Sequence, residues 1–422
     1  MKRTLTVPLG FIARRRFRLS IPALVLLLSA LHPPLSTVLA QGPLAPPGGP
    51  APTMKTLDQV EARTPIAGGT STRSINASGS YYLTGNINIS DGSNAIVIAA
   101  DNVTLDLNGF AIVSTSNSAA GAGVLITGER RSVAITNGNI SGSVAYVGGG
   151  DQFTGPGFAH GIRIDSGVEG ARVSHVSVSG CDQDAILVFS SGRNSTVTDC
   201  TVAVAGGTGI IASVVHNSSV RECGGSGISA NSVMNCHART HGFAASISAV
   251  TASNCHGICG STGSGVEALA ASNCHGETSL GLNGLEAQTA TGCTGRAGTG
   301  VGLRAETATN CTGISQSGTG LYAEVAQNCR GVSVGGDGLF ANYMATNSQG
   351  ITNAGRGLFT SIATNCFGQT LGGDLALFAH SANNCRGWQT DGVGIAIFAD
   401  IAVGCTTAGG TINCPSKHLG TP

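Results

Sequence analysis

The chain has 422 residues, of which 41% are apolar and only 10% are charged, with 22 basic and 22 acidic side chains. Glycine alone contributes 64 residues. Apolar residues at regular intervals among so many turn formers exclude a disordered chain and predict an ordered, turn-rich β protein.

The first 40 residues have the layout of a secretory signal peptide. Basic residues precede the apolar run Ile21–Leu31, and small residues end at Ala40, which predicts cleavage before Gln41. This run is shorter than the roughly 20 residues of a membrane-spanning helix. We therefore expect an exported chain, extracellular, at the cell surface or in the periplasm, with no transmembrane segment after signal removal. Cleavage leaves 16 basic and 22 acidic residues, a net charge of −6, which argues against a nucleic-acid partner.

The segments after the signal change character twice. Residues 41–53 are a Pro/Gly-rich linker, and residues 54–78 are predicted to cap the repeats that follow. Within this cap, Met54–Arg63 has the apolar spacing of a short amphipathic helix. From about Tyr81 the pattern becomes period-2 alternation in short runs bounded by Asn and Gly. Residues 79–410 are therefore predicted to form short strands joined by turns, with residues 411–422 as a tail.

A cysteine recurs at a nearly constant interval through the second half of the chain, and Ser348 fills the one empty position. This cysteine ladder consists of Cys236, Cys255, Cys274, Cys293, Cys311, Cys329, Cys366, Cys385 and Cys405. A fixed period of roughly 20 residues is typical of a solenoid, in which each repeat buries its apolar face against its neighbours. No repeat is long enough for a crossover helix. The predicted fold is an all-β, single right-handed parallel β-helix of about fifteen coils with a short N-terminal capping helix.

Two short patterns in these repeats predict which side chains point inward. In Gly-Leu-x-Ala, Leu and Ala face the core and the variable residue faces solvent. In Ala-x-Asn-Cys, Asn takes the bend and Cys points inward as a small apolar residue. An exported chain meets an oxidising compartment, so we expect a disulfide in Cys405 with Cys414 or in Cys255 with Cys259, although connectivity cannot be deduced from sequence.

Three segments near the start of the repeats carry a resemblance to a known family. They are Leu57–Ile66, Gly79–Ile87 and Asn102–Phe110. Together they resemble the opening of exported bacterial right-handed parallel β-helix repeat proteins within the pectin-lyase-like superfamily. The resemblance implies the fold and export, and it implies no activity.

One acidic group lies beside an insertion predicted at about residues 143–157. Its members are Asp151, His160, Asp165, Asp182 and Asp184. Glycoside hydrolysis needs two carboxyl groups roughly 5 to 9.5 Å apart, and neighbouring coils can supply that spacing. The segment Cys181–Ile186 resembles the paired-aspartate motif of polygalacturonases and His160–Ile162 their histidine motif, in the reverse order. A polysaccharide hydrolase is thus one functional hypothesis. A lyase is less favoured, because no basic residue beside an acidic calcium cluster is visible.

Two further rows of outward residues are candidate sites. His237, His256 and His275 each follow a ladder cysteine, so three imidazoles on consecutive coils are a candidate metal site. Five aromatic residues stand one per coil: Tyr322, Phe340, Phe359, Phe378 and Phe398. Either another segment covers this aromatic row or it contacts a partner. The favoured hypothesis is a structural or binding role at the cell exterior, with an extracellular polysaccharide or a surface protein as partner. No cofactor is predicted, and the oligomeric state is left open.

Overall fold

The structure, a computed structural model, describes residues 62–148, 152–189, 194–373, 375–392, 394–415 and 417–419. The chain divides into two units, Met1–Val60 and Glu61–Pro422, and every described residue belongs to the second. The predicted signal peptide, the linker and residues 54–61 of the predicted capping helix lie outside the described residues. The described residues contain no helix, and hence none long and apolar enough to cross a membrane.

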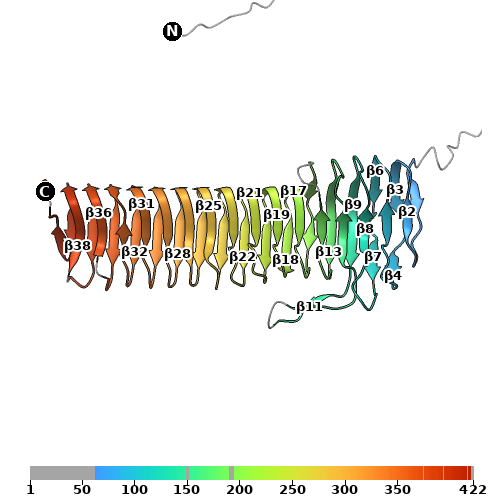
Figure 1. Ribbon diagram of the computed structural model, residues 1–422, viewed down its shortest axis with the longest axis horizontal. Helices are drawn as coiled ribbons and strands as arrows, with labels where there is room; N and C mark the ends of the chain where they lie inside the picture. The colour runs from blue at the N-terminus through green and yellow to red at the C-terminus, as the bar shows by residue number, and fades with distance from the viewer. Residues whose placement is uncertain are drawn as a thin grey trace, which may run out of the picture. The chain divides into compact units, whose positions relative to one another are not determined.

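The second unit is a solenoid of short strands (Figure 1). Its N-terminal coils contain β1 (Thr64–Ile66), β2 (Arg73–Ile75), β3 (Gly79–Leu83), β4 (Ile87–Ile89), β5 (Ile96–Ile98), β6 (Val103–Asp106), β7 (Ala111–Ser114), β8 (Ala122–Ile126) and β9 (Ala134–Ser141). An inserted hairpin follows, made of β10 (Ala145–Tyr146) and β11 (Phe153–Thr154). The middle coils contain β12 (His160–Ile164), β13 (Arg172–Ser179), β14 (Ile186–Val188), β15 (Thr196–Thr198), β16 (Thr201–Val202), β17 (Ile210–His216) and β18 (Ser219–Cys223).

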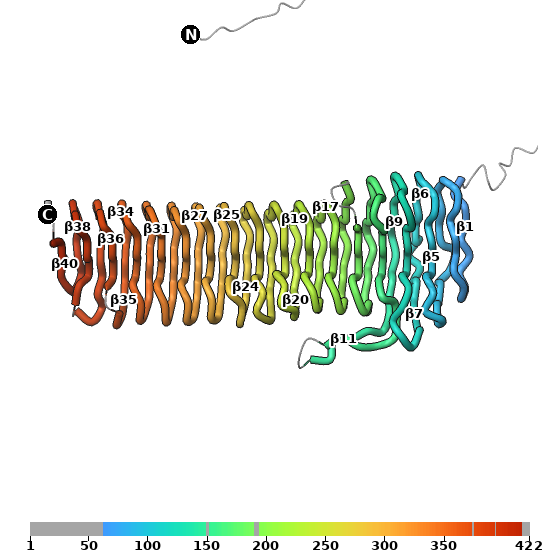
Figure 2. The backbone as a smooth tube through the Cα atoms, viewed as in Figure 1, coloured from blue at the N-terminus to red at the C-terminus, as the bar shows by residue number. Residues whose placement is uncertain are grey.

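The C-terminal coils alternate a long strand with a short one. They contain β19 (Ile228–Met234), β20 (His237–Thr240), β21 (Ile247–Ser253), β22 (His256–Cys259), β23 (Val266–Ser272), β24 (His275–Thr278), β25 (Asn283–Thr291), β26 (Thr294–Ala297), β27 (Val301–Thr309), β28 (Thr312–Ser315), β29 (Leu321–Gln327), β30 (Arg330–Ser333), β31 (Leu339–Thr346), β32 (Gln349–Thr352), β33 (Leu358–Phe359), β34 (Ile362–Thr364), β35 (Phe367–Thr370), β36 (Leu375–Asn383), β37 (Arg386–Gln389), β38 (Ile395–Val403), β39 (Thr406–Ala408), β40 (Thr411–Asn413) and β41 (Lys417–Leu419). Figure 2 shows the same regular coil repeated from β19 to β38.

Parallel pairing between successive coils confirms the predicted parallel β-helix. One column of paired residues runs from Thr64 in β1 to His418 in β41 and gives about 18 coils rather than the expected fifteen. The estimate was low because strand pairing starts at Thr64 and continues to Leu419. The segments assigned from sequence to a cap and a tail therefore add coils of their own.

The coils narrow along the chain, and the core residues shrink with them. Ile162, Ile186 and Ile210 pair in register on successive wide coils, as predicted. Further on, Leu303 pairs with Leu321 across a shorter coil. The short strands of these later coils carry an inward glycine in place of the earlier valine. A Cβ on Gly313 of β28, for example, would lie 2.1 Å from the carbonyl oxygen of Gly320, so only glycine fits there.

The Ala-x-Asn-Cys pattern has the predicted geometry. The asparagines before the ladder cysteines take left-handed backbone angles, such as φ = 53° at Asn365. Several also bond along the stack, as Asn365 Nδ2 donates to Asn347 Oδ1 at 3.2 Å. The ladder cysteines are buried in the core. At the empty position, Ser348 is equally buried, and its Oγ accepts the backbone N–H of Cys329 at 3.1 Å.

The two expected disulfides are absent, because Cys255 and Cys405 are free thiols. Between Cys255 and Cys259 the chain is extended along β22. Four residues of extended chain place the two Cα atoms about 13 Å apart, well beyond the ~7 Å limit for a disulfide. At the other position, the Cys405 thiol donates to the carbonyl of Val403 and the Cys414 thiol to that of Asp400.

Candidate functional sites

The structure brings together two of the five predicted catalytic residues. His160 and Asp184 occupy equivalent positions on successive coils, two residues before the paired Ile162 and Ile186. The imidazole of His160 is only 6% exposed, and its Nδ1–H donates to the Asp184 carbonyl oxygen at 3.3 Å. Asp184 Oδ1 accepts the backbone N–H of Thr208 at 2.7 Å. Burial lowers the pKa of His160, and the nearby Asp184 carboxylate opposes this only in part.

Asp165, another predicted catalytic residue, stands apart from this pair. Asp165 lies at the far end of β12 and forms an ion pair with Arg163 at 3.1 Å. Five residues of extended strand put it about 16 Å from His160, which is too far to act with Asp184 across one glycosidic bond. Asp182 is exposed, and Asp151 falls outside the described residues. The catalytic assignment therefore stays a prediction.

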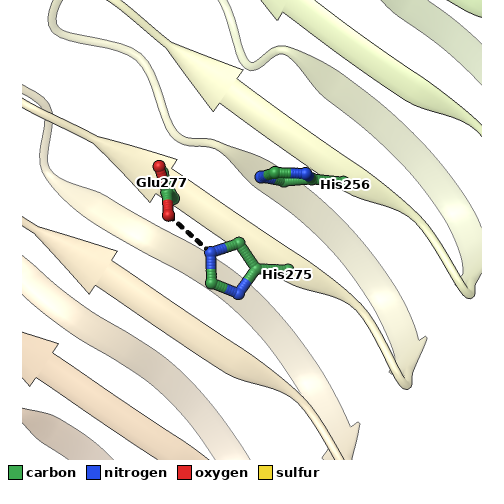
Figure 3. A group of neighbouring side chains, drawn as sticks. All are labelled: His256, His275 and Glu277. Carbon is green, nitrogen blue, oxygen red and sulfur yellow. Dashed lines mark hydrogen bonds and ion pairs between the residues drawn. The ribbon is translucent and has the colours of Figure 1, made fainter.

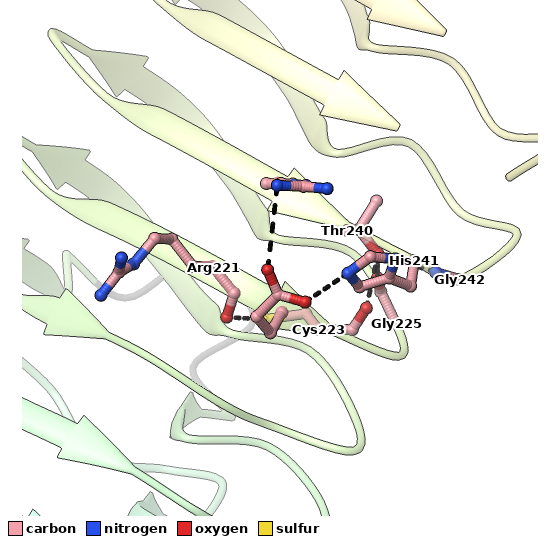
Figure 4. Close-up of polar contacts among 8 residues, drawn as sticks. Arg221, Cys223, Gly225, Thr240, His241 and Gly242 are labelled. Atoms are coloured by element: carbon pink, nitrogen blue, oxygen red, sulfur yellow. Dashed lines mark hydrogen bonds and ion pairs between the residues drawn. The ribbon is translucent and has the colours of Figure 1, made fainter. Parts of the chain in front are cut away.

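The inserted hairpin is a strap that lies across later coils. The rings of Tyr146 in β10 and His241 stack at 4.2 Å with their planes 11° apart. His241 Nε2 forms an ion pair with the carboxylate of Glu222; Figure 4 shows His241 beside Thr240 and Gly242. The ring of Phe153 in β11 occupies the space that a side chain on Gly224 would need, since a Cβ there would approach Phe153 Cε2 to 2.9 Å. The sequence predicted the insertion but contained no sign of where it docks.

The five predicted aromatic residues form one continuous ladder on the outside of the solenoid. Successive ring centroids are 4.6 to 5.3 Å apart, and successive planes differ by 2 to 18°. Arg356 covers the ring of Phe359 at 4.1 Å and forms an ion pair with Asp337. Beyond Phe398 the next position in the column is Asn413, so the described part of the tail extends the row and does not lie over it. The rings thus cover one another's faces and present their edges to solvent.

An axial groove runs along the same row of positions and ends at Tyr322, the first ring of the ladder. Its volume is about 430 Å³. One wall carries Glu267, Glu286, Arg304 and Tyr322, the other carries Leu269, Gln288, Glu306 and Glu324, and alanines form the floor. Register pairs Glu267 with Glu286, Glu286 with Arg304, and Arg304 with Tyr322. The groove and the aromatic ladder therefore follow one line parallel to the solenoid axis.

Glu267 and Glu286 pair on successive coils and are called the glutamate row below. A second hollow of about 320 Å³ lies on the other side of this row. It shares Glu267 and Glu286 with the axial groove and is also lined by Phe243 and Leu282. These two apolar side chains are 73% and 75% exposed. Sequence reasoning missed them because they lie in turns outside the repeating pattern. The signal available was a lone Phe in a turn, next to Gly242, that the alternation does not bury.

The three predicted metal-binding histidines also lie on successive coils, on a different row. The rings of His237 and His256 are 5.0 Å apart and those of His256 and His275 are 4.8 Å apart, each pair nearly perpendicular. His275 Nε2 bonds to Glu277 Oε1 at 2.7 Å. Glu277 was missed from sequence, although its position two residues after His275 on an alternating strand puts it on the same face.

No protein-family model and no curated protein matches the sequence. Among solved structures, the chain is similar to the enzymatically active domain of tailspike protein 2 from bacteriophage CBA120, with 14% identity and a TM-score of 0.28. The match covers 62% of this chain and only 38% of the tailspike chain. The chain is also similar to a hyperthermoactive exopolygalacturonase from Thermotoga maritima, with 13% identity and a TM-score of 0.19 over 82% of this chain and 84% of that one. The register of the chain's own strands establishes its fold as an all-β parallel β-solenoid.

Proposed function

We propose that the chain binds an extended polysaccharide along the glutamate row, between the axial groove and the second hollow. The observation that carries this proposal is the placement of Glu267 and Glu286 between the two hollows, beside the exposed ring of Phe243. Carboxylates accept hydrogen bonds from sugar hydroxyls, and an exposed aromatic face packs against the apolar face of a sugar ring.

The repeat of the wall residues suits a polymer rather than a small ligand. Each coil adds one residue to each wall, so the binding groups recur about every 4.8 Å along the axis. That interval is close to the length of one sugar unit in an extended glycan. The groove is also open and continues past several coils, as expected for a chain that extends beyond the site at both ends.

Charge restricts the class of polysaccharide. The groove walls carry Glu267, Glu286, Glu306 and Glu324 against one basic residue, Arg304. A polyanion such as a polyuronate would be repelled from such walls, whereas a neutral or amino-sugar polymer would not. We therefore assign the ligand to the neutral or cationic glycans.

Binding is favoured over hydrolysis because His160 and Asp184, the two predicted catalytic residues in contact, supply only one carboxyl group. His160 is buried and Asp184 is engaged by a backbone amide. With the predicted export of the chain, the proposed role is that of a glycan-binding scaffold at the cell exterior. The aromatic ladder prolongs the same line and would offer a row of ring edges as an apolar flank.

The proposal is tested by calorimetry on the purified chain with three soluble oligosaccharides: a neutral β-glucan, a glucosamine oligomer and an oligogalacturonate. We expect the neutral or the glucosamine oligomer to bind and the oligogalacturonate not to bind. Phe243→Ala should weaken binding by about tenfold, which corresponds to about 1.4 kcal/mol of lost stacking. Glu267→Ala should weaken it further by removing a hydrogen-bond acceptor.

The matched control is Phe189→Ala, since Phe189 is also exposed, at 51%, and lies away from both hollows. It should bind like the unmodified chain. Equal affinity of Phe243→Ala and the unmodified chain would contradict the proposed site. Binding of the oligogalacturonate alone would contradict the assigned class of ligand.

A further inference from the structure

A group of metal-ligating side chains lies on the short strands β22 and β24, on a row separate from the glutamate row. His256 and His275 are paired neighbours on successive coils, and Glu277 follows two residues after His275. One donor atom from each of the three lies within 4.8 Å of the other two. Figure 3 shows His275 directed at Glu277, with His256 on the adjacent strand. His237 stands one coil further back and is outside this group.

One donor atom of this group lacks a partner of its own. Among the described residues, the Nε2 atom of His256 is buried and has no hydrogen-bond partner. A buried nitrogen without a partner costs free energy that a bound ion would offset.

We propose that His256, His275 and Glu277 bind one divalent transition-metal ion of the Zn²⁺ type. Two imidazole nitrogens and one carboxylate oxygen form a ligand set that zinc accepts, with a further position left for water. Ligand atoms around one zinc stand about 3.3 Å apart, given metal–ligand bonds of 2.0 to 2.2 Å. The present separations are at most 4.8 Å. Rotation of the Glu277 and His275 side chains closes that difference, and the ion replaces the proton between them.

The residues around the group set its strength. Ile258 precedes Glu277 in the same column and places an apolar side chain on that side. Arg296 follows Glu277 on the next coil and opposes a second positive charge nearby. Arg296→Gln should therefore strengthen metal binding, which is a change that a purely structural role for these residues would not produce.

The test is titration of the purified chain, freed of metal, with Zn²⁺ in competition with a chromophoric chelator. We expect one Zn²⁺ per chain. Removal of a residue that only hydrogen-bonds to a metal ligand weakens metal binding by roughly 10- to 100-fold. Glu277→Gln or His275→Ala removes a ligand itself, so each should weaken Zn²⁺ binding by more than that. Affinity should also fall as the pH is lowered, because protons compete for both imidazoles. His380→Ala is the matched control, since His380 also pairs with a carboxylate, Asp400, but has a phenylalanine and no second histidine beside it.

Substitution with Co²⁺ separates this group from the cysteine ladder. Four-coordinate Co²⁺ bound to nitrogen and oxygen gives visible d–d absorption without a thiolate charge-transfer band. A thiolate band, or an unchanged Zn²⁺ affinity in the His256→Ala, Glu277→Gln double variant, would overturn the proposal. So would the absence of stoichiometric Zn²⁺ binding to the unmodified chain. Phe243→Ala should leave Zn²⁺ binding intact, so this result is independent of the glycan proposal.

Discussion

Substitution of Phe359 by alanine should destabilise the solenoid through the loss of ring stacking. Phe359 stacks on Phe340 at 4.6 Å and on Phe378 at 4.8 Å, and Arg356 lies over its ring at 4.1 Å. Each aromatic pair contributes about 0.5 to 1.5 kcal/mol beyond its buried area, and a partly exposed cation–π contact about 0.5 to 1 kcal/mol. The free energy of unfolding should therefore fall by about 1.5 to 4 kcal/mol in Phe359→Ala from the ring contacts alone. Phe359→Leu removes the same ring contacts but keeps most of the apolar volume, so it should lose this stacking contribution without the further cost of the cavity that alanine leaves.

Urea unfolding followed by far-UV circular dichroism measures this change from the transition midpoint and slope. The control is Tyr343→Ala, because Tyr343 is an aromatic residue of the same strand β31 as Phe340 but is 61% exposed. Its replacement should change the free energy of unfolding by no more than about 0.5 kcal/mol. If Phe359→Ala costs no more than Tyr343→Ala, the stacked rings do not stabilise the fold. The row would then have to be explained by a partner alone.

Four further outcomes follow from the core and the bends. Asn365→Ala should cost about 1 to 2 kcal/mol of the free energy of unfolding in the same urea assay, because alanine is strained at φ = 53°, and Asn365→Gly should recover part of it. Ser348→Ala should cost about 1 to 3 kcal/mol by leaving the buried N–H of Cys329 unbonded, whereas Ser348→Thr keeps the hydroxyl as a comparison. Burial lowers the pKa of His160 below 6.5, so the unfolded chain binds a proton at this imidazole more readily than the folded chain does. Thermal stability should therefore be level above about pH 6.5 and fall below that pH. The fall should be shallower in His160→Gln. Burial raises the pKa of the Cys236 thiol to about 11, so peptide mapping after iodoacetamide at pH 8 should find it unmodified in folded protein and modified in urea.

The fold was largely predictable because its rules are local and repeated. Alternation assigned the inward Leu303 and Leu321, and the bend rule assigned the left-handed Asn365. The buried Ser348 follows from its place in the cysteine period. Each of these depends only on the register between neighbouring coils. The coil count was low because the terminal strands are short and lack the motif of the central repeats.

The candidate sites were less predictable because they depend on distances between rows. Asp165 and Asp184 lie on adjacent coils, but their places along the strands separate them. Glu277 joins the histidines through alternation, a signal that the sequence did contain. The hollows beside Glu267 arise from bends in the strands and from turn residues such as Phe243, and neither follows from the repeat.

The strap has a consequence for how the solenoid unfolds. In a stack with contacts only between adjacent coils, stability adds up coil by coil and the ends fray first. The strap leaves the solenoid just after Ile140 and docks on His241. The strand register places Ala238, which is close to His241, four coils further on than Ile140. No coil within that span can open far without detaching the Tyr146 ring from His241. The coils from Ile140 to Ala238 are thus held as one cooperative block, while the coils on either side retain the graded, end-first unfolding of an ordinary repeat array.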